Sequence, residues 1–212
     1  MKGMTDTTAK LFVPLSKLEC IKPYILVGGT ALAMQIDHRR SEDLDFMKWS
    51  TTIDEVPEVD WYGIQEELRG IGEVQHTNIL GFDHAEFMVD GVKVSFYATT
   101  RHRPQMSPIH SINNIWLADI DAIGAMKMEV LLRRSNFRDY YDIYAILREG
   151  RDFNAMMQNA LVHSAHRLKS KNLIAMLTDA SRFRTDEGFS HLAPKYSVSA
   201  SDIETYLRGL LR

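Results

Sequence analysis

The 212-residue sequence has one cysteine, no long apolar run and almost no excess of charge of one sign. A single cysteine, Cys20, excludes an internal disulfide and cannot by itself hold a structural zinc ion. No apolar run approaches the ~20 residues that a membrane helix needs, and the N-terminal segment lacks a signal-peptide pattern. The sequence therefore predicts a cytoplasmic protein with no membrane partner.

The overall composition is that of an ordinary globular chain. Apolar residues make up 45% and charged residues 25% of the sequence, which excludes a disordered tail or a coiled-coil rod. The net charge of −3 is a small difference between 28 acidic and 25 basic residues, so the total charge indicates no class of partner. A nearly neutral chain can still carry a basic face for phosphates.

Hydrophobic periodicity and turn residues predict an α+β protein, with a β-rich first half and a helical second half. We expect strands at Tyr24–Val27, Leu44–Met47, Ala85–Val89 and Val92–Tyr97, with a short edge segment at Asn113–Trp116. We expect a loop at residues 49–60, and helices at Leu11–Ile21, Thr30–His38, Gly63–Gly70, Asp119–Arg134, Arg138–Arg148, Phe153–Lys169 and Lys171–Phe183. A capping box at Ser201–Glu204 is expected to open the last helix.

Two glycines, Gly28 and Gly29, separate a buried strand from a helix. Without Cβ atoms there, the backbone can approach a ligand closely, and the start of the helix offers unpaired N–H groups to an anion. Thr30 either adds a hydroxyl to such a site or caps the helix. Taken alone, the pair is weak evidence for such a site and favours a plain structural turn.

Two carboxylates, Asp43 and Asp45, alternate along the next predicted strand. Alternate residues share one face of a strand, so the two side chains project together and repel each other unless a cation lies between them. Mg²⁺ suits such a pair, because it takes one or two carboxylates and completes its shell with water and substrate phosphates. The alternative is a solvated strand end.

Four motifs carry a resemblance to a known family. They are Gly28-Gly29-Thr30 followed by His38-Arg39, Ser41 and Asp43-Leu44-Asp45; then Gly91–Tyr97, Ala125–Arg134 and Phe137–Leu147. In this order they resemble the AbiEii/AbiGii nucleotidyltransferase family, which includes toxins of abortive-infection and other toxin–antitoxin systems. The resemblance spans about Tyr24 to Leu147.

The resemblance implies a polymerase-β-like nucleotidyltransferase fold: a small mixed sheet with helices, followed by a helical C-terminal half. With the change from strands to helices along the chain, we expect residues 1–115 to form the α/β core and residues 116–212 to form the helical half that completes the active-site cleft. The expected reaction transfers a nucleotidyl group from an NTP, held on Mg²⁺ or Mn²⁺, to an acceptor hydroxyl. RNA, notably tRNA, is the acceptor for some relatives, and an antitoxin protein is the expected partner.

The same resemblance assigns residues to roles. The catalytic set is Asp43, Asp45, Lys127 and Asp142, with the first two as metal ligands; the nucleotide-binding set is Gly28, Gly29, Thr30, Arg39, Ser41, Lys127, Arg138 and Asp139. Helical spacing agrees, since Lys127 and Arg134 share a face and so do Asp139 and Asp142. Two alternatives stay open: Lys127 packing its aliphatic stem with the ammonium in water, and an Arg138–Asp142 ion pair.

One departure concerns the third carboxylate that enzymes of this fold usually carry, because Ser95 occupies the matching position. If Asp90-Gly91 forms a two-residue hairpin turn, Glu86 falls opposite Ser95 and becomes a candidate third metal ligand. The departure leaves two further readings open. One is a catalytically impaired nucleotide-binding or interaction module, and the other is a nucleotidyltransferase that modifies a small molecule such as an antibiotic.

Overall fold

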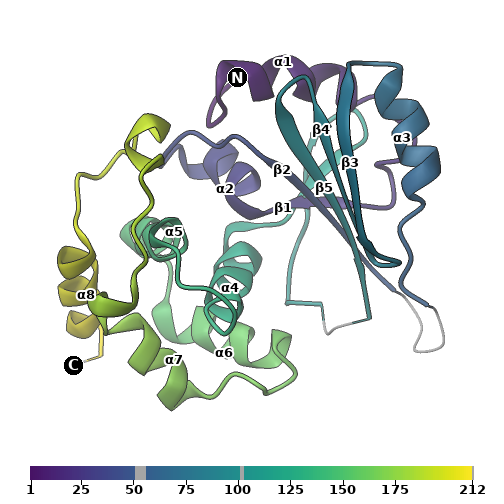
Figure 1. Cartoon of the computed structure of the whole chain (residues 1–212). Coiled ribbons are helices and arrows are strands. Elements are labelled where there is room, and N and C mark those ends of the chain that lie inside the picture. The colour runs from purple at the N-terminus through teal and green to yellow at the C-terminus, as the bar shows by residue number, and fades with distance from the viewer. Residues whose placement is uncertain (51–55, 101–102, 212) are drawn as a thin grey trace. The chain divides into compact units, whose positions relative to one another are not determined.

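The computed structural model describes residues 1–50, 56–100 and 103–211 (Figure 1). Residues 51–55 of the expected loop lie outside this part of the chain. The described residues belong to two compact units. The first comprises Met1–Gln35, Arg40–Arg101 and Ser107–Asp119, and the second comprises Ile36–Arg39, His102–Met106 and Ile120–Arg212. The division into domains at residue 115 stays a prediction.

The first unit contains a mixed sheet, which has seven strands within the described residues. In chain order the strands are β1 Ile25–Val27, β2 Leu44–Trp49, β3 Val74–Gly81, β4 His84–Val89, β5 Val92–Thr99, β6 Ile109–Ile112 and β7 Ile115–Leu117. Their spatial order is β3-β4-β5-β2-β1-β7-β6. The pairs β2–β5 and β1–β7 are parallel and the others antiparallel, so the predicted mixed α+β fold is confirmed.

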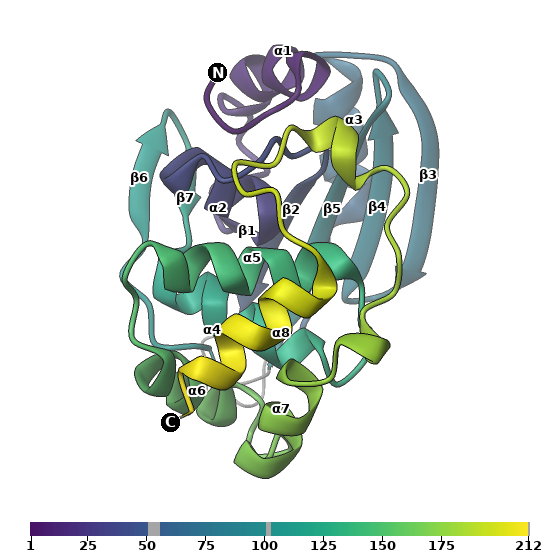
Figure 2. The ribbon, with the colours of Figure 1, turned by 90° about the vertical axis from the view of Figure 1, so that its left-hand side faces the viewer.

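One face of this sheet forms the core of the first unit. Phe46 and Phe96 stack on neighbouring strands with ring centroids 5.2 Å apart, and both are buried. Helix α1 (Asp6–Leu15) contacts strand β5, and helix α3 (Trp61–Arg69) contacts strands β3 and β4. Figure 2 shows α3 behind strands β3 to β5. Side chains alternate along a strand, so the residues that flank each aromatic, such as Asp45 and Ser95, face the other side of the sheet. That side carries the polar groups.

The second unit is helical: α4 Ile120–Val130, α5 Phe137–Arg148, α6 Phe153–His163, α7 Ser170–Leu177 and α8 Ala200–Gly209, with short 3₁₀ turns at Ala180–Arg182 and Phe189–Leu192. Helix α5 lies between α4 and α8 (Figure 1) and supplies the aromatic core. Tyr140 and Tyr141 are fully buried; Tyr140 stacks on Phe183 at 3.6 Å between centroids, and Tyr141 meets the edge of Phe189. No helix in the described ranges is long and apolar enough to cross a membrane.

Several predicted helix boundaries are wrong. The first helix begins at Asp6 rather than Leu11, because Thr5 caps it. The helix expected to reach Lys169 ends at His163, since Ala165 and His166 adopt positive φ angles of 52° and 57°.

The ends of the last helices also differ from the prediction. Helix α7 starts at Ser170 and ends at Leu177 rather than continuing to Phe183. The last helix has its capping box at Ser199 and Asp202, not at Ser201–Glu204.

Candidate functional site

The glycine turn and the acid pair meet at the junction of β1, α2 (Gly28–Ile36) and β2. The antiparallel register pairs Val27 with Asp45. Gly28 has a φ of +71°, and a Cβ atom there would lie 2.8 Å from Oδ2 of Asp45. Position 28 therefore requires glycine for two reasons: its backbone conformation, and the room that it leaves for the Asp45 carboxylate.

A second contact fixes Asp43 to the same helix. The Thr30 hydroxyl is buried and donates a short hydrogen bond to the main-chain carbonyl of Asp43. A hydroxyl has only one proton to donate, so Thr30 uses its donor to position the chain beside the acid pair. Sequence analysis left open whether Thr30 binds a ligand or has a structural role, and the structure shows a positioning contact.

The β4–β5 hairpin and the neighbouring strand β2 align three polar side chains in a row, Glu86, Ser95 and Asp45. Asp90 and Gly91 adopt φ angles of +48° and +77°, which are typical of a two-residue type I′ turn. As predicted, Glu86 pairs with Ser95, and Ser95 in turn pairs with Asp45 on β2. Ser95 is fully buried, and its Oγ has no hydrogen-bond partner among the described residues.

The chemistry of the acid pair fits Mg²⁺. Asp43 and Asp45 offer hard oxygen ligands on one sheet face, and such an ion needs no further protein ligand when water and phosphates complete its shell. Glu86 lies two strands from Asp45, about 10 Å between Cα atoms, and its carboxylate is 3.5 Å from Nε2 of His84. Within the described ranges, no three His, Cys, Asp or Glu side chains form a metal-binding group. The role of Glu86 as a metal ligand stays a prediction.

Sequence analysis missed one residue of this face, Lys93 on β5. Its Nζ lies 3.6 Å from Oδ2 of Asp43, and both side chains are more than a third exposed. Lys93 stands two residues before Ser95, and the alternation of the strand puts both on the face that carries Asp45. The parallel pairing of β5 with β2 was the missing information, because no register between these strands follows from local sequence pattern.

The second unit contains a cluster of charged groups of its own, centred on Asp142 of α5. Its Oδ1 accepts hydrogen bonds from Nε2 of His38 and Nε of Arg39, each at 2.8 Å, while Nη2 of Arg39 donates to Oδ2 at 2.9 Å. Asp142 is fully buried and Arg39 nearly so. A carboxylate in such a place is stable only because cations surround it.

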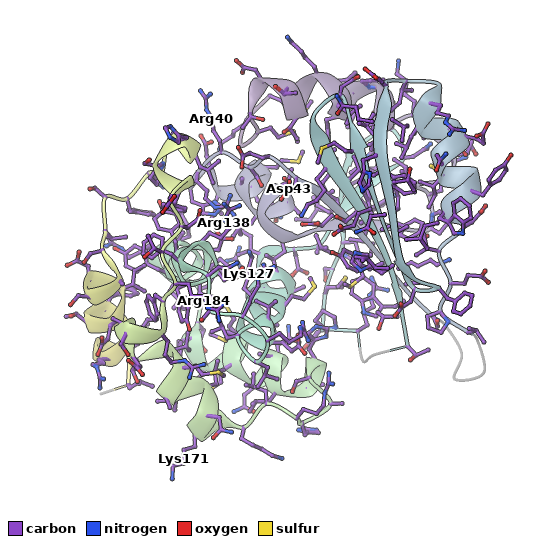
Figure 3. All side chains as sticks on the ribbon, viewed as in Figure 1. Arg40, Asp43, Lys127, Arg138, Lys171 and Arg184 are labelled. Atoms are coloured by element: carbon purple, nitrogen blue, oxygen red, sulfur yellow. The ribbon has the colours of Figure 1, made fainter. Side chains whose placement is uncertain are left out.

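Lys127 of α4 links Asp142 to Asp139. Its Nζ is 2.7 Å from Oδ2 of Asp142 and 2.8 Å from Oδ1 of Asp139, and Figure 3 shows the side chain between α4 and α5. Arg134 donates two further hydrogen bonds to Asp139. The predicted face-sharing of Asp139 with Asp142 is confirmed, since both bind Lys127. The helix predicted to reach Arg134 ends at Val130, so Lys127 and Arg134 share a partner, Asp139, but not a helix face.

These contacts shift the acid–base properties of the cluster. Burial alone would raise the pKa of Asp142, but Arg39, Lys127 and His38 outweigh it and hold that pKa well below its usual range. Burial alone would lower the pKa of Lys127, but Asp142 and Asp139 outweigh it, so that pKa is raised. Burial lowers the pKa of His38, with Asp142 opposing it only in part. The imidazole is therefore neutral at pH 7, while its lysine and carboxylate neighbours are charged.

Comparison with known proteins decides the family. The profile of the family described as "Nucleotidyl transferase AbiEii toxin, Type IV TA system" matches residues 11–208. The chain belongs to the AbiEii nucleotidyltransferase toxin family. An uncharacterized protein of Aquifex aeolicus, aq_aa25, is 30% identical over 129 residues. That match spans 59% of this chain and 58% of the relative.

Solved structures resemble this chain in fold. JHP933 from Helicobacter pylori has a TM-score of 0.59 at 17% identity, over 98% of this chain and 91% of its own. The nucleotidyltransferase toxin MenT4 from Mycobacterium tuberculosis has a TM-score of 0.61 at 15% identity, over 96% of this chain and 82% of its own. At such identities the likeness concerns the fold alone.

The AbiEii motif residues of the second unit are held by ion pairs within the protein. Arg39, Lys127, Asp139 and Asp142 form the buried cluster, and Arg138 binds Asp186 through two hydrogen bonds of 2.5 and 3.1 Å. The alternative of an Arg138–Asp142 ion pair is therefore wrong. Ser41, in the first unit, is held through its main chain by Gly3 and Thr5. The direct roles of these residues toward a nucleotide stay predictions.

Proposed function

We propose that this chain transfers a nucleotidyl group from an NTP to an acceptor hydroxyl with the help of Mg²⁺, for which Mn²⁺ can substitute. The observation that carries the proposal is the close packing of the glycine turn at Gly28 and Gly29 against the acid pair, Asp43 and Asp45. The Asp45 carboxylate occupies the space that a Gly28 side chain would fill, and Thr30 holds the main chain of Asp43.

The proposed reaction forms one bond and breaks one. The acceptor oxygen attacks the α-phosphorus, the bond between the α-phosphorus and the bridging oxygen of the β-phosphate breaks, and pyrophosphate leaves. The acceptor hydroxyl loses its proton to solvent, since Ser95 replaces the carboxylate that would otherwise receive it. The bound metal ion would neutralise phosphate charge as it develops.

The chain's own residues bind and orient the NTP. The main-chain N–H groups at the start of α2, around Gly28 and Gly29, favour phosphate oxygens through hydrogen bonds and the helix dipole. Asp43 and Asp45 hold the metal ion at the same turn. Positioning of this kind accounts for most of the catalysis in phosphoryl-type transfers.

We propose RNA, and tRNA in particular, as the acceptor. Support comes from the motif resemblance and from exposed basic residues on the second unit, namely Arg167, Lys169 and Lys171. Lys171 points outward from α7 (Figure 3). We propose the cytoplasm as the location, because NTPs and RNA are both present there. The family description as part of a toxin–antitoxin system supports an antitoxin as the partner.

The test is transfer of label from α-³²P-labelled NTPs to total RNA, with a mixture of aminoglycosides as the competing acceptor class. Wild type is compared with Asp45→Asn and with Asp83→Asn, which removes an exposed carboxylate of the same unit. We expect labelled RNA with wild type and Asp83→Asn, and none with Asp45→Asn or excess EDTA. Equal labelling by all three proteins would refute the proposed site, and labelled aminoglycoside would identify a small-molecule enzyme.

The buried, unpartnered Ser95 favours a second candidate function, nucleotide binding without turnover. A carboxylate at that position could bind metal or accept a proton at neutral pH, and a serine hydroxyl does neither. Calorimetric titration with each NTP and Mg²⁺ separates the two functions. Binding without label transfer to any acceptor supports the second candidate.

A further inference from the structure

Lys93 stands beside the metal-binding carboxylates, and the AbiEii motifs give it no role. The register of β2 on β5 pairs Leu44 with Val94 and Asp45 with Ser95, which puts Lys93 opposite Asp43. The Nζ–Oδ2 distance is 3.6 Å, and 38% of the lysine side chain is exposed. This ammonium lies on the sheet face where the triphosphate is expected.

The contact between Lys93 and Asp43 is loose. A separation of 3.6 Å exceeds hydrogen-bond length, and an exposed ion pair of this kind contributes little free energy. Lys127 differs, because two carboxylates hold its ammonium at 2.7 and 2.8 Å and its side chain is only 9% exposed. Lys93 can therefore exchange its partner at low cost, whereas Lys127 would have to leave two buried anions.

We propose that Lys93 is a phosphate-binding residue that exchanges its counter-ion during substrate binding. Without metal it neutralises Asp43; when a divalent cation binds Asp43, the ammonium is displaced and binds the triphosphate of the NTP. The proposal rests on the proposed function and adds a residue to it. Its physical basis is that the cation competes with Lys93 for one carboxylate, while the triphosphate brings new negative charge to the same face.

The first test is Mn²⁺ titration in the absence of nucleotide, followed by the electron paramagnetic resonance signal of free Mn²⁺. Lys93→Met removes the competing charge and should bind Mn²⁺ about two- to fivefold more tightly, the range expected from an exposed ion pair. The matched control is Lys48→Met, which removes a lysine of β2 that lies over the ring of Tyr24, on the other face of the sheet. Lys48→Met should bind Mn²⁺ like wild type.

The second test uses Mg²⁺ and NTP. Lys93→Met should raise the KM for the NTP roughly tenfold, the effect of losing a charged hydrogen bond, with a much smaller change in kcat. Lys93→Arg keeps the charge and should restore most of the loss. A lysine that only stabilises the fold would move neither the Mn²⁺ affinity nor the ratio of KM to kcat in this way.

The results separate this inference from the proposed function. If Lys93→Met matches wild type in both titrations, or if Lys48→Met shows the same changes, Lys93 is not a phosphate-binding residue. If wild type binds neither Mn²⁺ nor NTP, the proposed function fails. If wild type binds both and only the Lys93 variants show no effect, the proposed function stands and the assignment of Lys93 is overturned.

Discussion

At the scale of single residues, Gly28 links the two parts of the candidate site, which are the glycine turn at the start of α2 and the acid pair on β2. Its positive φ sets the start of α2, and its missing side chain makes room for Asp45. Another glycine of the same unit separates these two effects. Gly91 has a similar φ of +77°, and a Cβ atom there would meet nothing within 4 Å.

We predict that Gly28→Ala and Gly91→Ala lose stability to a similar degree, about 1–2 kcal/mol, because both force alanine into the left-handed region. Gly28→Ala should also lose Mn²⁺ binding and nucleotide transfer, since its Cβ displaces the Asp45 carboxylate. Urea unfolding measures the first effect and Mn²⁺ titration the second. Unchanged Mn²⁺ affinity in Gly28→Ala would show that Asp45 holds no metal.

Sequence reasoning succeeded at this scale where the chemistry is local. The Asp90-Gly91 turn fixed the pairing of Glu86 with Ser95, and the alternation of Asp43 and Asp45 identified the acid pair. Lys93 escaped notice because its contact depends on the register between β2 and β5, whose residues lie fifty positions apart. His38 was missed as a partner of Asp142 for the same reason, since 104 positions separate them.

At the scale of elements, the buried cluster ties α4 and α5 to the segment Ile36–Arg39. Asp142 compensates the charges of Arg39 and Lys127, and both cations are buried. Removing one member leaves the others uncompensated in a medium where water cannot replace the lost partner. The cluster therefore holds these three elements together, whatever else it does.

We predict that Asp142→Ala lowers the free energy of unfolding by about 3–5 kcal/mol, the cost of breaking a buried ion pair from one side. The control is Lys22→Met, which removes the exposed Lys22–Glu19 pair and should cost no more than about 1 kcal/mol. Chemical unfolding of both variants measures the difference. Equal stability of the two variants would mean that Asp142 has no role in holding the helices.

The same cluster predicts how stability depends on pH. Burial holds the pKa of His38 below its ordinary value of 6.5, so the unfolded state takes up the proton first and stability falls as the pH drops below about 6.5. Asp142 has a pKa well below 3.8, so its contribution is complete above that value and is lost as the pH falls further. Both groups destabilise the fold in acid, in two successive ranges.

His38→Gln separates the two ranges, because glutamine keeps an N–H donor for Asp142 and does not titrate. We expect the stability of this variant to vary less between pH 7 and pH 5 than that of wild type, while the loss below pH 4 remains. Thermal unfolding at several pH values measures both. Parallel curves for the two proteins would exclude His38 as the titrating group.

Elements were predicted with uneven success, for identifiable reasons. Strand β3 was missed because it is an edge strand whose exposed positions do not alternate strictly with buried ones. The last helix was shifted because two serines, Ser199 and Ser201, each precede an acidic residue at the spacing of a capping box, and the chain uses the first. The local sequence pattern predicts the presence of a helix or strand more reliably than it predicts the residues at which that element begins and ends.

At the scale of the whole molecule, the sheet-bearing unit and the helical unit carry different parts of the AbiEii motifs. The first unit holds the glycine turn, the acid pair and Lys93, which are the groups suited to metal and phosphate. The second holds Lys127 and Asp142, which already neutralise each other. The family assignment, made from four motifs in order, is confirmed across residues 11–208.

The central claim is that Asp43 and Asp45 support transfer of a nucleotidyl group rather than a phosphoryl group. The most direct measurement compares α-³²P-labelled with γ-³²P-labelled NTP in parallel reactions with RNA. With wild type, we predict that the α-label enters RNA and that the γ-label leaves as pyrophosphate. With Asp45→Asn, we predict neither incorporation of the α-label into RNA nor release of labelled pyrophosphate. Entry of the γ-label into the acceptor, or undiminished transfer by Asp45→Asn, would contradict the account.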